Sequence, residues 1–328
     1  MSTTRFDLVG IGNAIVDVVA STEDDFLSRH DMRKGSMRLI SAPDAEALYG
    51  AMPPGQESSG GSAANTCAVA AGLGARVAFL GKVADDQLGR VFRHDIAAAG
   101  VHYPTPPLAG AAPTARCLIL VTPDAQRTMN TFLGACVGFA PEDLDEAVIQ
   151  DSAIVYLEGY LFDPPQAQAA FLRAADLAHE AGRKVALSLS DAFCVDRHRD
   201  AFRDLVRDHV DILFANEAEI CSLYEEDEFE AAATQAGSHV ALAALTRSEA
   251  GSVILRGAER VEIAAAPARL VDTTGAGDAY AAGFLAAYAQ GRDLPACGRL
   301  GSMAAASLIE HVGARPQTNL SALVRALG

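Results

Sequence analysis

The sequence predicts an α/β protein, a three-layer sandwich in which helices cover both faces of a mostly parallel central sheet. From residue 144 onward, short apolar runs at 153–158, 184–189 and 211–214 alternate with longer helical patterns at 165–181 and 199–208. This alternation is typical of parallel strands joined by crossover helices. Ligands of such sheets bind at the carboxyl ends of the strands, so polar side chains that follow a strand are candidate site residues.

The composition indicates a globular chain with ample apolar material for a core. Half of the 328 residues are hydrophobic and 21% are charged. The formal net charge of −16 disfavours nucleic acid and anionic membranes as partners. Six scattered cysteines without a Cys-x-x-Cys pair fit buried thiols better than a zinc site or a disulfide framework. The first residues do not read as a signal peptide and no apolar run could cross a bilayer, so we expect a cytoplasmic protein.

The first predicted strand covers 6–12 and ends in Gly10 and Gly12. A dinucleotide-binding fingerprint would need its third glycine at position 15, which is Ile15, so the motif fails and an NAD-dependent oxidoreductase is disfavoured. The next predicted elements are an extended segment, a charged turn, a second extended segment and a helix, at 15–20, 23–33, 36–41 and 43–52.

A glycine pair, Gly60 and Gly61, opens a predicted helix that runs to Gly74. Two glycines expose backbone to a ligand, and Asn65 in the first helical turn can donate and accept hydrogen bonds at once. Asn65 could instead be only a capping residue. The remaining elements before residue 144 are a strand, a helix, a proline-rich connector and a hairpin of two strands, at 76–83, 85–99, 103–113, 115–122 and 127–133.

The dipeptide Gly81-Lys82 does not mark a P-loop. That motif requires a glycine at position 76 and Ser or Thr at position 83, and the chain has Arg76 and Val83 there. Beyond the alternating region, further strands are predicted at 240–246 and 252–255 and a helix at 300–310.

The stretch from Val271 to Leu285 is predicted to be a loop that turns directly into an alanine-rich helix. Gly275 and Gly277 allow several backbone N–H groups to point into one space at the helix N-terminus, where an anion is favoured. Asp278 at the helix start could take a proton from an attacking hydroxyl while the amides hold a phosphoryl group. For a lone Gly-Ala-Gly, a glycine turn capped by Asp278 would explain the same residues.

The run from Asp272 to Phe284 resembles the C-terminal signature of the ribokinase-like (PfkB-type) carbohydrate and nucleoside kinases, and Glu57–Thr66 resembles the N-terminal one. The resemblance extends over essentially the whole chain. It implies a single ribokinase-like domain over 1–328 with a small β-sheet lid from about 13–41 and 102–134. It also implies ATP-dependent phosphorylation of a primary hydroxyl with Mg²⁺, and it leaves a monovalent cation such as potassium open.

The resemblance also assigns roles to individual residues. At the transferring phosphate, Asp278 would be the catalytic base, and the anion hole would be formed by Gly275, Ala276 and Gly277. The residues implied to contact the acceptor are Asn13, Asp17, Gly60, Gly61 and Asn65. A carboxylate that accepts two vicinal hydroxyls suits a ribose or similar sugar, whereas the alternative is that Asp17 merely ends a strand. Arg127 would lean towards the transferring phosphate, unless it is an exposed strand arginine.

On the nucleotide side, Asn216 and Glu219 follow a predicted strand and resemble the family's Asn-x-x-Glu motif, which is tied to magnesium and phosphate. Glu219 would act on Mg²⁺ indirectly, from an outer shell. As an alternative, it is an ordinary first-turn acid that the helix dipole favours. The other implied nucleotide contacts are Thr246, Gly251 and Gly313. Ser248 stands where many relatives have a glycine, which weakens the expected contact at Thr246.

Within the family the chain most resembles the adenosine kinases, on the segments Asn13–Asp17, Arg127–Leu133 and Tyr156–Tyr160. We therefore expect adenosine as the acceptor, converted to AMP in purine salvage by a monomer or homodimer. The apolar walls for the base would be Ile15, Met129 and Tyr160, which could also be ordinary lid or core packing. The alternatives are a kinase for ribose, fructose or a keto-deoxy sugar acid, and a non-catalytic nucleotide- or sugar-binding regulator, which the presence of Asp278 disfavours.

Overall fold

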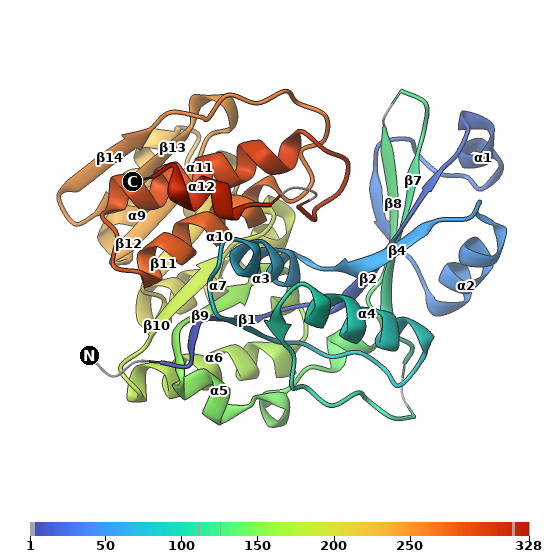
Figure 1. Cartoon of the computed structure of the whole chain (residues 1–328), viewed down its shortest axis with the longest axis horizontal. Helices are drawn as coiled ribbons and strands as arrows, with labels where there is room; N and C mark the ends of the chain where they lie inside the picture. The colour runs from blue at the N-terminus through green and yellow to red at the C-terminus, as the bar shows by residue number, and fades with distance from the viewer. Residues whose placement is uncertain (1–3, 111, 125, 317–318, 328) are drawn as a thin grey trace.

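The protein consists of a body, formed by a nine-stranded sheet with helices on both faces, and a five-stranded small sheet beside it (Figure 1). The computed structural model describes residues 4–110, 112–124, 126–316 and 319–327. Figure 1 shows the small sheet at the right, joined to the body by the chain that enters β2 and leaves β4. The α/β class that the sequence predicts is confirmed.

The central sheet is parallel except at one edge. Every neighbouring pair from β12 to β6 is parallel, and β13 and β14 are added antiparallel. In spatial order the strands are β14 (Glu259–Ile263), β13 (Ser252–Arg256), β12 (Leu242–Thr246), β11 (Ile212–Asn216), β10 (Lys184–Ser188), β9 (Ser152–Glu158), β1 (Phe6–Ile11), β5 (Val77–Leu80) and β6 (Val101–His102).

Alternate residues of the central strands face two separate hydrophobic cores. In β9, Ile154 and Tyr156 belong to one core, whereas Val155 and Leu157 belong to the other. Burial on both faces explains why these strands read as continuous apolar runs. The first core is covered by α3 (Ser62–Gly72), α4 (Gln87–Ala98), α10 (Ala276–Ala289) and α11 (Leu294–Ile309), against which α12 (Ser321–Arg325) packs. The second is covered by α5 (Glu146–Gln150), α6 (Pro165–Glu180), α7 (Ala192–His209), α8 (Glu217–Tyr224) and α9 (Phe229–His239).

The small sheet buries one face and leaves the other partly open. Its strands, in spatial order, are β3 (Met37–Leu39), β8 (Arg127–Phe132), β7 (Ala115–Val121), β2 (Ile15–Ser21) and β4 (Gln56–Gly60). Burial alternates along β2: Val16 and Val18 are buried, whereas Ile15 and Asp17 are partly exposed. The buried face packs against α1 (Asp24–Arg29) and α2 (Ala42–Ala51) through apolar side chains that include Phe26 and Leu48.

The structure corrects four local expectations. The predicted charged turn at 23–33 contains α1, whose Phe26 anchors it to the core. The residues before the glycine pair form β4, which pairs with β2 and adds a strand from outside the two expected lid ranges. The edge strand β14 was not expected. Helix α7 begins at Ala192 rather than 199, because Asp191 caps it by accepting a hydrogen bond from the N–H of Phe193.

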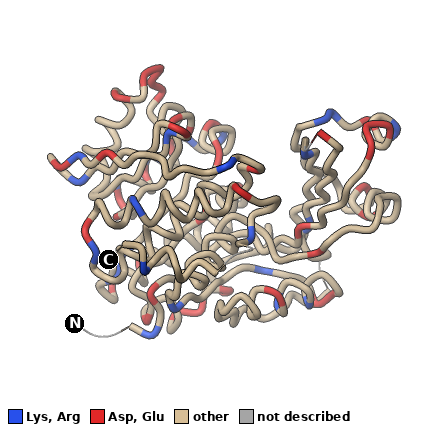
Figure 2. The backbone as a smooth tube through the Cα atoms, turned by 45° about the horizontal axis from the view of Figure 1, so that its top comes forward, with Lys and Arg blue, Asp and Glu red and all other residues tan. Residues whose placement is uncertain are grey.

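Acidic and basic side chains are interleaved over the body and the small sheet (Figure 2). With a formal net charge of −16, the mean field of the molecule is negative. Among the residues that the structure describes, no helix is long and apolar enough to cross a membrane.

Candidate active site

Asp278 lies in the first turn of α10, directly after the glycine loop. Gly275 caps this helix with a φ of +76°, and a side chain there would come within 2.9 Å of Ala314. A Cβ added to Gly277 would meet nothing within 4 Å. Gly275 is therefore required by the turn and its packing. Gly277, by contrast, leaves free space beside the first N–H groups of the helix. Such N–H groups have no carbonyl of a preceding helical turn to bind. The N–H of Ala276 itself donates to the carbonyl of Thr273.

The Asp278 carboxylate is oriented by two residues of α3. Ser62 Oγ donates to one carboxylate oxygen at 2.6 Å, and Asn65 Nδ2 donates to the other at 3.4 Å. Burial raises the pKa of Asp278 to about 6, while these two hydrogen bonds and the charge of Arg315 act in the opposite direction. A carboxylate with a raised pKa that stays partly exposed can accept a proton from a bound hydroxyl near neutral pH.

Asn65 keeps one polar atom unused. It is almost completely buried, and within the described ranges its side-chain oxygen has no hydrogen-bond partner. The N-cap of α3 is Gly61, and the N–H of Asn65 donates to the Gly61 carbonyl within the helix. The capping interpretation of Asn65 is thus wrong. A buried amide oxygen of this kind is a site for a ligand hydroxyl, since an unsatisfied buried acceptor is costly.

The glycine pair packs directly on two other predicted acceptor residues. A side chain at Gly60 would collide with the carboxylate of Asp17, and one at Gly61 would collide with the carbonyl of Asn13. Gly61 also has a φ of +96°, a conformation that favours glycine. Asp17 lies in the middle of β2, paired with Ser58, so the interpretation that it ends a strand is wrong. Burial raises the pKa of Asp17 to about 6, against the lowering effect of nearby Arg315 and Arg127.

Glu158, which the sequence did not single out, connects the segment that contains Asn13 to the start of α3. It is buried at the carboxyl end of β9. One carboxylate oxygen accepts from the N–H of Asn13 at 3.2 Å and from Asn13 Nδ2 at 2.7 Å, and the other accepts from the N–H of Ala63 at 2.7 Å. Burial raises the pKa of Glu158 to about 7. Glu158 thereby holds Asn13 through its backbone N–H and one N–H of its side-chain amide.

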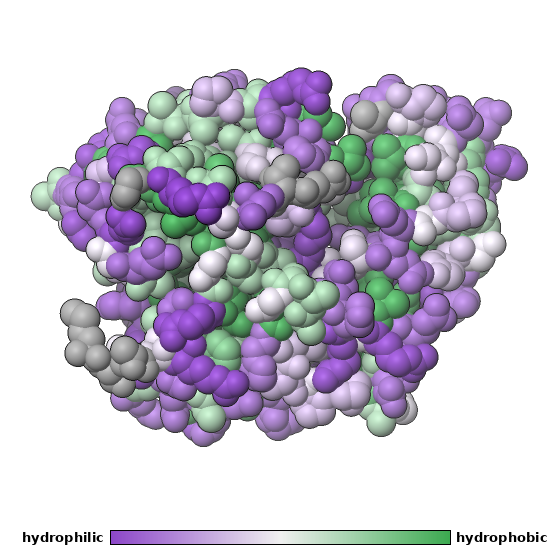
Figure 3. All heavy atoms as spheres, viewed as in Figure 1, coloured by the Kyte–Doolittle hydropathy of each residue, from purple (hydrophilic) through white to green (hydrophobic). Residues whose placement is uncertain are grey.

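The partly open face of the small sheet is apolar around Asp17. Register places the alternate residues of neighbouring strands on one face, and this inner face includes the apolar residues Ile15, Val19, Ile119, Met129, Met37 and Leu39 together with the polar residues Ser58, Arg127 and Thr131. Met37 and Leu39 are 55% and 60% exposed. Figure 3 shows green, hydrophobic atoms where the surface is hollowed between the small sheet and the body.

Arg127 extends from this inner face to the loop before α10. Its Nη1 donates to Thr274 Oγ1 at 2.7 Å and lies 3.0 Å from Asp272 Oδ2. Its side chain is 11% exposed, so the interpretation as an exposed strand arginine is wrong. In the described part of the chain, Nη2 is buried without a partner. Arg127 therefore carries an unused donor at the edge of the glycine loop.

Two exposed aromatic rings stand at the carboxyl ends of neighbouring body strands. Tyr160 follows β9 in a 3₁₀ turn (Gly159–Phe162) and is 41% exposed. Phe193, a residue that sequence reasoning missed, opens α7 after β10 and is 75% exposed. The two segments are in contact, because Cys194 Sγ donates to the Gly159 carbonyl at 3.2 Å. Exposed aromatic rings at this edge of a parallel sheet are suited to stack on a planar ligand.

Comparison with known proteins agrees with this geometry. Residues 37–320 match the pfkB family carbohydrate kinases. The chain belongs to this family. The pfkB kinase is 50% identical to a probable sugar kinase from Rhizobium etli CFN 42, with a TM-score of 0.92 over 98% of each chain. It is 51% identical to an adenosine kinase from Sinorhizobium meliloti, with a TM-score of 0.91 over 99% of this chain and 100% of that one.

A more distant relative is named for a different acceptor. The ATP-dependent ribose-1-phosphate kinase of Halopiger xanaduensis is 31% identical over 282 residues, which cover 81% of this chain and 87% of that protein. The predicted enzyme class, a carbohydrate or nucleoside kinase, is confirmed. As a member of this family the pfkB kinase uses ATP and binds a small-molecule acceptor.

Asn216 and Glu219 of the pfkB kinase form a reciprocal capping box at the start of α8. Asn216 Oδ1 accepts from the N–H of Glu219, and the Glu219 carboxylate accepts from both nitrogens of Asn216, at 2.9 and 2.6 Å. Both carboxylate oxygens are thus engaged. Among the described residues, no group of three or more His, Cys, Asp or Glu side chains could hold a metal ion. This donor set fits a magnesium ion bound mainly by ATP oxygens, with Glu219 acting through water.

The other residues expected at the nucleotide lie in turns whose backbone conformation and packing explain the residue types found there. Thr246 ends β12 beside the 3₁₀ turn Ser248–Ala250, and Ser248 adopts a φ of +50°, a conformation that favours glycine. Gly251 has a φ of +86°, and a side chain there would strike the carbonyl of Ile263. Gly313 has a φ of +100°, and its N–H donates to Asp272 Oδ2 at 2.7 Å. Gly313 is thereby joined to the glycine loop.

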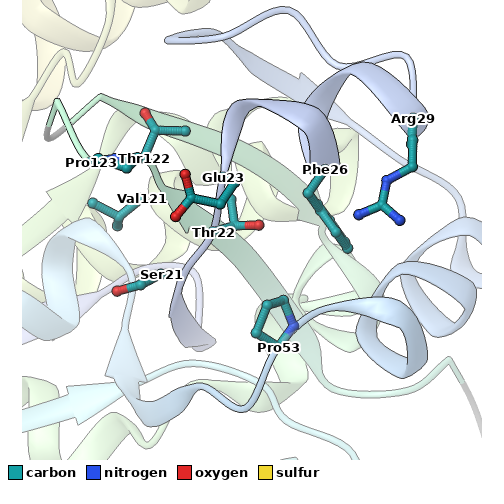
Figure 4. Close-up of a pocket in the computed structure, with 9 residues that line it drawn as sticks. All are labelled: Ser21, Thr22, Glu23, Phe26, Arg29, Pro53, Val121, Thr122 and Pro123. Carbon is teal, nitrogen blue, oxygen red and sulfur yellow. The ribbon is translucent and has the colours of Figure 1, made fainter.

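A separate pocket lies at the far end of the small sheet. It has a volume of about 390 Å³ and lies between the ends of β2 and β7 and helix α1 (Figure 4). Figure 4 shows Phe26, Arg29 and Pro53 on one side of it and Val121 to Pro123 on the other. Because β2 begins at the site with Ile15 and reaches this pocket only at Ser21, the pocket is distinct from the candidate active site.

Proposed function

We propose that this kinase transfers the γ-phosphoryl group of ATP to the primary hydroxyl of adenosine, with AMP and ADP as products. The proposal rests chiefly on one observation, the apolar inner face of the small sheet around Asp17. A sugar alone would need polar partners, whereas a nucleoside also requires an apolar wall for its base. Ile15 and Met129 would supply that wall from the small sheet, and Tyr160 and Phe193 would supply it from the body.

In the proposed reaction, Asp278 takes the proton of the acceptor hydroxyl as the oxygen forms a bond to the γ-phosphorus. The bond to the leaving ADP oxygen breaks, and the N–H groups beside Gly277 hold the charge on the phosphoryl oxygens. The buried, unused Nη2 of Arg127 would donate to the same group. The ribose hydroxyls would be bound by Asp17 and by the free oxygen of Asn65.

Magnesium would neutralise charge on the ATP phosphates, which is the chemistry that this ion supplies in kinases. The side chains of the protein would bind the ion through water rather than coordinate it directly. Glu219 would orient a water of the ion from within its capping box, and Asn216 keeps that carboxylate in place. The turns at Thr246, Gly251 and Gly313 would contact the nucleoside part of ATP. Closure of the small sheet over the acceptor would exclude water and limit ATP hydrolysis.

The second candidate is a sugar kinase, supported by the probable sugar kinase and the ribose-1-phosphate kinase among the relatives. A phosphorylated sugar would need a cation for its second anionic group. The apolar inner face of the small sheet favours adenosine over any sugar, because a sugar has no base to place against it.

An acceptor panel tests the proposal. ADP formation is measured with ATP, Mg²⁺ and adenosine, ribose, fructose, a keto-deoxy sugar acid or ribose 1-phosphate. We expect adenosine to exceed ribose in kcat/KM by about 100-fold or more, since burial of a base-sized apolar surface contributes on the order of 3 kcal/mol. A higher kcat/KM for any of the sugars would replace the adenosine assignment. Ligand binding without ADP from any acceptor would favour the non-catalytic regulator.

A further inference from the structure

Arg315 links the C-terminal segment of the chain to the acceptor site. It follows Ala314, which packs on Gly275 of the glycine loop. Its Nε donates to the carbonyl of Ser59 at 2.9 Å, its Nη2 donates to Ser59 Oγ at 2.6 Å, and its Nη1 donates to the carbonyl of Ala64 at 3.0 Å. All three of these bonds go to neutral oxygen atoms, and the charges that act on the guanidinium are those of Asp95, then Asp17, and further Asp278.

The two residues that hold Arg315 flank the glycine pair. Ser59 precedes Gly60, whose backbone supports the Asp17 carboxylate. Ala64 lies in the first turn of α3, between the two residues that donate to Asp278. Ser59 is itself anchored, because its N–H and its hydroxyl both donate to Asp95 of α4, at 2.8 and 2.5 Å. Arg315 therefore clamps the segment that positions both carboxylates.

The charge of Arg315 acts in a strongly acidic surrounding. The titratable and charged groups on the elements around Asp278 and Arg315 include Asp17 and Arg127 of the small sheet, Tyr156 and Glu158 of β9, Tyr160, Asp191, Glu219 of α8, Cys67 of α3 and Asp95 of α4. Arg127 is paired with Asp272. Arg315 lowers the pKa of both Asp17 and Asp278, against the effect of burial. An acceptor that displaced water from the site would strengthen all of these interactions.

We propose that Arg315 is a positioning residue whose fixed positive charge keeps Asp17 and Asp278 ionised when the acceptor covers them. The inference rests on the proposed function, in which Asp278 accepts the hydroxyl proton. It adds a residue that neither contacts the reacting atoms nor belongs to the family motifs identified in the sequence.

The test compares Arg315→Gln, which removes the charge but keeps an amide donor, with Arg315→Lys and with Arg203→Gln. Arg203 of α7 is a control because it also binds a backbone carbonyl, that of Leu223 in α8, and pairs there with Glu225 rather than with a site residue. The pH dependence of kcat is measured with the best acceptor of the panel. In parallel, carboxyl NMR titration of the folded protein reads the pKa values of the aspartates without any turnover.

We expect Arg315→Gln to move the acid limb of kcat upward by about one pH unit, since a charge within several ångströms shifts a pKa by that order. At about pH 6 its activity, relative to its own value at about pH 8, would fall by roughly fivefold more than in the wild type. Arg315→Lys should restore the limb, and Arg203→Gln should leave it unchanged.

An unshifted acid limb and unshifted carboxyl pKa values in Arg315→Gln would overturn the proposal, even if the variant were less stable. If Arg315→Gln fails to fold, Arg315→Lys tests the proposal instead. A shifted acid limb of kcat in this variant, which retains the positive charge, would contradict the mechanism. If the wild type phosphorylates no acceptor, the proposed function fails. The NMR titration then still decides whether Arg315 controls the two carboxylates.

Discussion

At the scale of single residues, the carboxylate of Asp278 is held in place by other side chains of the protein. Ser62 and Asn65 fix both of its oxygens from a different helix. Such preorganisation means that orienting the base costs little when the acceptor arrives. The raised pKa also sets the pH range in which Asp278 can act as a base.

The role of Asp278 leads to a direct prediction. Asp278→Asn should lower kcat by about 10²–10⁴-fold with little change in acceptor or ATP affinity, because loss of a general base acts on the transition state. In the wild type, kcat should fall as the pH drops through about 6, since the carboxylate whose pKa is raised to that value becomes protonated there. Steady-state kinetics and calorimetry measure both effects. A variant with near-normal turnover would show that Asp278 is not the base, and lost affinity with normal kcat would make it a binding residue.

The sequence identified Asp278, Asp17 and the glycines because each lies in a local motif. It could not identify Glu158 or Arg315. Glu158 binds Asn13 across 145 residues, and Arg315 binds Ser59 across 256 residues. A glutamate at the end of a strand and an arginine in a loop carry no local pattern, and only the folded chain brings their partners to them.

At the scale of elements, the small sheet combines an apolar wall and a carboxylate on one face. The sequence predicted its hairpin from alternating residues around a turn. It did not predict β4, because Ser58, Ser59 and Gly60 have low strand propensity and become extended through pairing with β2. It also did not predict α1, in which charged residues surround the two core residues Phe26 and Leu27.

The apolar wall predicts how acceptors are discriminated. Met129→Ala and Tyr160→Ala should each raise the Kd for adenosine by about tenfold and leave the Kd for ribose nearly unchanged, because only the base loses contact. Isothermal titration with the two ligands measures this. The control is Leu172→Ala, an exposed apolar residue of α6 at 42% exposure, which should affect neither. Equal weakening of adenosine and ribose would place the base elsewhere.

At the scale of the whole molecule, the body and the small sheet are joined across the site by the ion pair of Arg127 and Asp272. The α/β architecture was predictable because the body strands are buried on both faces and their helices are amphipathic. The relative placement of the two sheets was not, since it depends on this long-range ion pair and on the hydrogen bonds that join Ser59 of β4 to Arg315 and to Asp95 of α4.

A ligand that bridges the two parts should stabilise the native protein as a unit. At a concentration 100 times its Kd, adenosine should add about 2.7 kcal/mol and raise Tm by about 4 °C for a chain of this size. Differential scanning fluorimetry measures the shift. Asp17→Ala should abolish the adenosine shift and retain the ATP shift, because it removes only acceptor contacts. A shift with ribose or fructose but none with adenosine would disprove the adenosine assignment and leave the kinase class intact.

Asp272 has a further consequence for how the two substrates influence one another. The same carboxylate accepts the N–H of Gly313, fixes Thr274 in the glycine loop and pairs with Arg127 of the small sheet. On the proposed assignments, nucleotide binding at Gly313 and closure over the acceptor would share this one side chain. Thermodynamic reciprocity requires that whatever factor ATP contributes to acceptor affinity is returned equally by the acceptor to ATP. Any coupling through Asp272 would therefore change the Kd of both substrates by the same factor.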